Sequence, residues 1–142
     1  SPSDMYGVGF YAWAVGADGA YVSRIFESGP PYNAFHFPDG SLILPDRGGR
    51  FRPTLGLVLL SQGIDDYRLA RRCEALLAEA RRRKVEAAGL DTLLRTIRGT
   101  CDAHPPRFDS GRFLTGPVKP DQLRKWRQQL AEEAGKVSEA LP

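Results

Sequence analysis

The stretch Tyr6-Gly-Val-Gly-Phe-Tyr-Ala-Trp-Ala-Val15 sets the expectation for the fold, because every residue in it is apolar, aromatic or glycine. Apolar side chains on both alternating faces are typical of a β-strand covered on both sides, as in a parallel sheet. Such a strand needs a neighbouring strand on each edge. We therefore predict a buried strand over residues 6–15.

The residues after this stretch offer few further strands. Gly16-Ala-Asp-Gly19 has turn chemistry, and residues 20–26 alternate well enough for a second strand or an extended arm. Residues 27–51 are irregular and interrupted by Pro and Gly, which is typical of a long functional or irregularly packed loop. One or two strands cannot close a core, so we expect the missing strands to lie upstream of Ser1.

An apolar stripe with steps of three and four residues predicts one long helix over residues 54–86, with Pro53 at its first position. Gly63 is its weak point, because Gly is about 1 kcal/mol less favourable than Ala inside a helix. The stripe consists of Leu55, Val58, Leu59, Gln62, Leu69, Cys73, Leu76, Leu77 and Ala80.

Two further helices are predicted in the C-terminal part. A short one is expected over residues 90–97, and an amphipathic one begins after Pro120, beyond a Pro- and Gly-rich connection over residues 101–118. The basic run Arg81-Arg-Arg-Lys84 falls at the end of the long helix, where cations suit the helix dipole. We expect this run to be a solvated helix end rather than a nucleic-acid patch.

The chain resembles the C-terminal part of barrel proteins related to glycoside hydrolase family 123. The motifs that carry the resemblance are Gly9-Phe-Tyr-Ala-Trp13, Gly16-Ala-Asp-Gly-Ala-Tyr21, Phe37-Pro-Asp-Gly40, Pro53-Thr-Leu55 and Gln62-Gly-Ile-Asp-Asp-Tyr-Arg-Leu69. The resemblance covers residues 6–80, and its most specific part is Gly63-Ile-Asp-Asp-Tyr67.

The resemblance implies an α/β fold. Residues 1–86 would form the closing strand-loop-helix unit of a (β/α)8 barrel, and residues 87–142 would form a C-terminal helical tail. This unit would be incomplete as a stand-alone fold. It would meet the remaining barrel upstream in the same protein or in a partner chain.

Glycoside hydrolysis needs two carboxyl groups at a fixed separation, or one carboxyl group assisted by a substrate amide. The resemblance implies a catalytic Asp-Glu pair on a mid-barrel strand, and this chain does not contain that strand. Asp65 and Asp66 point about 100° apart on a helix, so they cannot form such a pair. We expect them to be structural, with Asp66 or Tyr67 tying the helix to a neighbouring loop. No catalytic residue is predicted in this chain.

The candidate sugar-binding residues are Trp13, Asp18, Tyr32 and His36. Trp13 and Asp18 lie near the C-terminal end of the predicted strand, where barrel enzymes place their active sites. Trp13 offers a face for a sugar ring, and the alternative is a core tryptophan. Asp18 would accept hydrogen bonds from sugar hydroxyls, and the alternative is an Asp-Gly turn. Tyr32 and His36 either line the sugar site or pack the long loop.

Several classes of site are not expected. His36 and His104 have no partner at metal-ligand spacing, and Cys73 and Cys101 form no CxxC motif, so we predict no metal, no cofactor and two buried thiols. The chain has no apolar run long enough to span a membrane. No aromatic residue interleaves with the basic run over residues 81–84. We therefore expect neither a membrane nor a nucleic-acid partner.

These observations predict the C-terminal portion of a carbohydrate-active, glycoside hydrolase-like protein. This portion would contribute barrel closure and one rim of a sugar site, and carbohydrate would be the substrate of the full-length protein. The larger protein would be the hydrolase, and we expect this chain to be inactive alone. The alternative is a non-catalytic structural or protein-interaction module. The sequence does not indicate a compartment.

Overall fold

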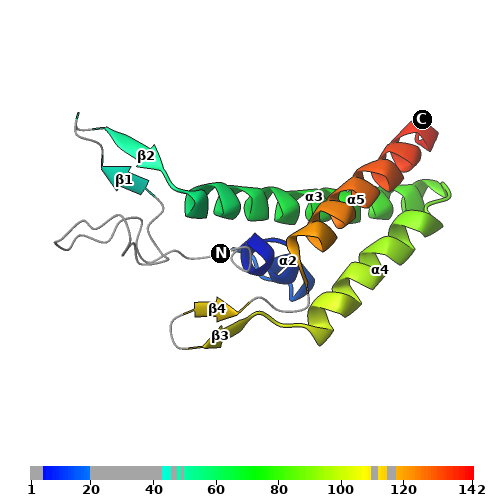
Figure 1. Ribbon diagram of the computed structural model, residues 1–142. Helices are drawn as coiled ribbons and strands as arrows, with labels where there is room; N and C mark the ends of the chain where they lie inside the picture. Colours follow the sequence, from blue (N-terminus) through cyan, green and yellow to red (C-terminus); the bar gives the residue numbers. More distant parts are fainter. Residues whose placement is uncertain (1–4, 20–42, 46–47, 49, 110–111, 115–117) are drawn as a thin grey trace.

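The computed structural model describes residues 5–19, 43–45, 48, 50–109, 112–114 and 118–142, and this part of the chain is mainly helical. Three long helices pack against one another: α3 (Leu55–Arg83), α4 (Ala88–Ala103) and α5 (Pro120–Ala140). A shorter helical segment, residues 5–14, packs against α3 and α4 (Figure 1). It contains η1 (Gly7–Tyr11), a π-helical turn, and α2 (Ala12–Ala14).

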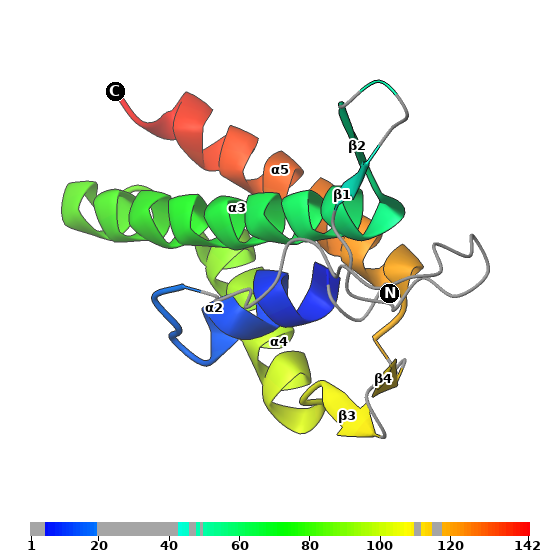
Figure 2. The same ribbon diagram turned by 90° about the vertical axis from the view of Figure 1, so that its left-hand side faces the viewer.

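The strands of the described residues form two short antiparallel hairpins. One pairs β1 (Ile43–Pro45) with β2 (Phe51–Pro53), and the other pairs β3 (Arg107–Asp109) with β4 (Arg112–Leu114). The first hairpin precedes α3 and the second follows α4 (Figure 2). No parallel strands occur in the described ranges. The predicted α/β class, with a closing strand-loop-helix unit of a (β/α)8 barrel, is therefore wrong.

The predicted strand over residues 6–15 is helical instead. Tyr6, Phe10, Trp13 and Ala14 are all buried, and their spacing of three or four residues places them on one helical face. A short apolar run does not distinguish a buried strand from a buried helix. Here the run forms a helical segment that packs against α3 and α4, so the residues on the face toward these two helices are buried. The strand or arm expected over residues 20–26 lies outside the described residues.

The long helix is confirmed, with a corrected start. Thr54 caps it, because Thr54 Oγ1 accepts a hydrogen bond from the backbone N–H of Leu57 at 3.3 Å. Pro53 is not the first helical residue but the last residue of β2. The helix ends at Arg83 rather than at residue 86, because its C-cap Lys84 has a left-handed backbone with φ 57°. The side chains of residues 81–84 are exposed, as predicted.

The apolar stripe of α3 is buried only in its second half. Cys73, Leu77 and Ala80 belong to the core, whereas Leu55 is 73% exposed and Val58 is 45% exposed. The first turns of α3 extend beyond α4 and α5 (Figure 1), so these helices cannot cover them.

The two C-terminal helices complete one core. The predicted short helix over residues 90–97 is part of the longer α4, and α5 begins at Pro120 as predicted. Phe10 meets the ring of Trp126 edge to face, with centroids 5.3 Å apart. Both cysteines are buried, which confirms the prediction for the thiols. The expected domain division after residue 86 falls in the turn between α3 and α4, and residues from both sides share this core.

Gly63 allows α3 to approach the N-terminal helical segment closely. A Cβ atom on Gly63 would lie 2.5 Å from Val8 Cγ2 and 2.6 Å from the Met5 carbonyl oxygen. A Cβ atom on Gly9 would lie 2.9 Å from the Gly63 carbonyl oxygen. Both separations at Gly63 are shorter than van der Waals contact allows, so a side chain there would push the segment away.

Gly63→Ala is therefore expected to lower the free energy of unfolding by about 1–3 kcal/mol, the usual cost of overpacking. Gly99→Ala in α4 and Gly135→Ala in α5 are the matched controls, because a Cβ atom at either position meets nothing within 4 Å. Both controls should raise stability by about 0.5–1 kcal/mol through helix propensity. Urea denaturation measures the free energy of unfolding of all three variants. A stabilised Gly63→Ala variant would contradict the close packing of the two segments.

Candidate functional site

Trp13 lies in the core, with 2% of its surface exposed. The Arg98 guanidinium sits 4.5 Å from the ring centroid, in cation–π geometry. The same guanidinium donates to the Ala14 carbonyl oxygen at 3.1 Å and to Glu74 Oε1 at 2.5 Å. The ring therefore has no free face for a sugar. Trp13 is a core tryptophan, which was the alternative to a sugar-binding role.

Asp18 is exposed and lines a small hollow of about 290 Å³ beside α3. The walls of this hollow are mainly apolar, with Val8, Leu60 and Ile64 among them. The structure does not bring Asp18 and Trp13 into one site, because one lies on the surface and the other in the core. Tyr32 and His36 lie outside the described residues, so their sugar-binding role stays a prediction.

The Gly63–Tyr67 element holds three parts of the protein together. Asp66 is 1% exposed, and its Oδ1 accepts a hydrogen bond from Arg127 Nε of α5 at 2.5 Å. Arg127 Nη2 also reaches Met5 Sδ at 3.5 Å. The Tyr67 hydroxyl donates to the Ala17 carbonyl oxygen at 2.7 Å, which confirms the predicted tie between the helix and a neighbouring loop.

The two carboxyl groups of this element have different surroundings. Asp65 is exposed and pairs with Arg68 at 3.4 Å. Asp66 Oδ2 is buried and has no hydrogen-bond partner among the described residues. Burial raises the pKa of Asp66 to about 6, against the lowering effect of Arg127. Asp66 therefore acts in a buried ion pair, and no route to a substrate is open to it.

Arg127 was not predicted as a partner of Asp66. Its spacing from two apolar residues could have indicated a position beside the core. Arg127 lies four residues after Leu123 and three before Leu130, and both leucines are fully buried. A cation at that spacing flanks the buried face of the helix. What the sequence did not show is which helix that face meets.

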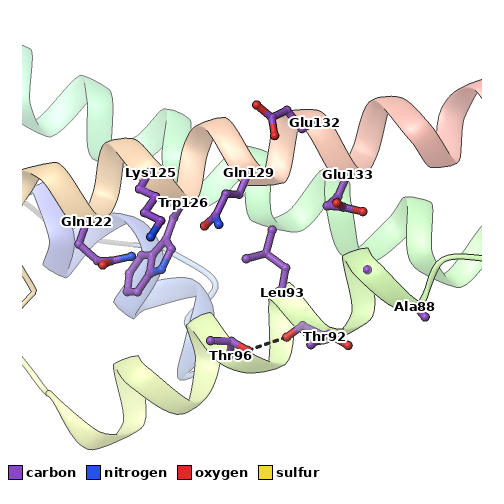
Figure 3. Close-up of a pocket in the computed structure, with 11 residues that line it drawn as sticks. Ala88, Thr92, Leu93, Thr96, Gln122, Lys125, Trp126, Gln129, Glu132 and Glu133 are labelled. Atoms are coloured by element: carbon purple, nitrogen blue, oxygen red, sulfur yellow. Dashed lines mark hydrogen bonds between the residues drawn. The ribbon is translucent and has the colours of Figure 1, made fainter.

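A larger groove runs between α4 and α5, with a volume of about 670 Å³. Figure 3 shows the α5 side chains of the groove above those of α4. The α4 wall is low because Ala88, Thr92 and Thr96, which follow one another at four-residue spacing, all have short side chains. The α5 wall consists of Gln122, Lys125, Trp126, Gln129, Glu132 and Glu133. This groove was not predicted, because the sequence does not show that α4 faces α5.

Other kinds of site find no support in the described ranges. No group of three or more His, Cys, Asp and Glu side chains is placed there to hold a metal ion. Burial raises the pKa of Cys73 and of Cys101 to about 11, so neither thiol ionises near neutral pH. None of the helices described here combines the length and apolarity needed to cross a membrane.

Comparison with known proteins gives no assignment. The chain matches no protein family, no curated protein and no solved structure. The likeness to glycoside hydrolase family 123 therefore stays a prediction from the quoted motifs.

Proposed function

We propose that this chain is a non-catalytic helical module of a larger carbohydrate-active protein. The observation that carries the proposal is that the Gly63–Tyr67 element makes internal contacts. Gly63 packs on the N-terminal segment, Asp66 pairs with Arg127, and Tyr67 binds the Ala17 carbonyl oxygen. This element is the most specific part of the resemblance, and its contacts are those of a structural support rather than of a catalytic centre.

The first turns of α3 offer a surface for the rest of the larger protein. Residues 57–60 are all apolar and follow Leu55 and Gly56, so the helix is apolar on every side there. A helix that is apolar on every side is normally buried. Leu55, Val58 and Ile64 are nevertheless exposed. We propose that this surface packs against the remainder of the larger protein or against a partner chain.

The purified chain is expected to show no turnover of aryl glycosides. The two carboxyl groups of the α4–α5 groove, Glu132 and Glu133, are adjacent on one helix and point about 100° apart, and the smaller hollow has only Asp18, so neither cavity has the facing pair that hydrolysis requires. Release of the chromophore from aryl glycosides measures this activity. Turnover that disappears in an Asp18→Asn variant would overturn the non-catalytic assignment.

The docking surface has its own test in the larger protein. Leu55→Ser combined with Val58→Ser is expected to weaken the association of this module with the rest, because about 25 cal/mol is lost per Å² of apolar surface that is no longer buried. Ala78→Ser is the control, since Ala78 is exposed on the second half of the same helix. Limited proteolysis and thermal melting report the association. Equal behaviour of the double variant and the control would contradict the proposed contact.

A further inference from the structure

We draw no further inference here: the strongest candidate, the apolar hollow of about 290 Å³ between the segment around Val8 and the first half of α3, adjoins the docking surface already proposed, and its two charged residues, Asp18 and Arg68, have opposite signs, so nothing in the described part of the chain shows what covers it.

Discussion

Replacing Arg127 by Met is expected to lower the free energy of unfolding by about 3–5 kcal/mol at about pH 8, the usual loss when one partner of a buried ion pair is removed. Asp66 would then keep its buried charge without the guanidinium that now donates to Oδ1. Arg124→Met is the matched control on the same helix, because Arg124 pairs with an exposed Asp121. Exposed pairs contribute only about 0–1 kcal/mol, so the control should change little. Chemical denaturation measures both variants.

The free energy of unfolding that is lost in the Arg127→Met variant should become smaller at lower pH. The pKa of Asp66 is about 6 in the folded protein and 3.8 as the ordinary value, so the folded state binds the proton more tightly. The stability gained from this proton is fully present below the unfolded pKa and is lost as pH rises through the folded pKa. Removing Arg127 raises the folded pKa further. Asp66 is then neutral at about pH 5, and the attraction that Arg127 provides no longer matters.

Two outcomes would contradict this account of the ion pair. One is an equal loss of stability at about pH 5 and about pH 8. The other is a failure of Asp66→Asn to rescue Arg127→Met at the higher pH, since neutralising both partners removes the uncompensated charge.

The helices α3 and α5 could be predicted because several local signals agree in each. Pro120 at the start of α5 and the apolar steps from Leu123 through Trp126 to Leu130 indicate the same helix. The N-terminal segment could not be assigned in this way. Its residues are apolar at every position, so the steps from Tyr6 to Phe10 and Trp13 fit a helical face and a doubly buried strand alike. Packing against α3 and α4 resolves the ambiguity.

The structural role of Asp66 and Tyr67 also followed from the sequence, because adjacent residues on a helix cannot form a catalytic pair. Their partners did not follow. Arg127 is 61 residues from Asp66 along the chain, and Ala17 is 50 residues from Tyr67. The groove depends in the same way on two helices meeting. Contacts of this range are set by how the apolar faces pack, and one sequence does not reveal that arrangement.

Trp13→Ala is expected to lower the free energy of unfolding by about 3–5 kcal/mol, the usual cost of truncating a buried tryptophan. The ring is 2% exposed, and its loss would also release the Arg98 guanidinium from its cation–π contact. Trp13→Phe is the matched control. It keeps an aromatic ring and removes the indole N–H, which is buried without an acceptor among the described residues. Its cost should be smaller, about 1–2 kcal/mol.

A double-mutant cycle with Arg98→Met separates the cation–π contact from burial. Met keeps an apolar side chain at this position but loses the charge, so the coupling with Trp13 should be about 0.5–2 kcal/mol. If Trp13→Ala keeps its full stability, the place of Trp13 in the core is wrong.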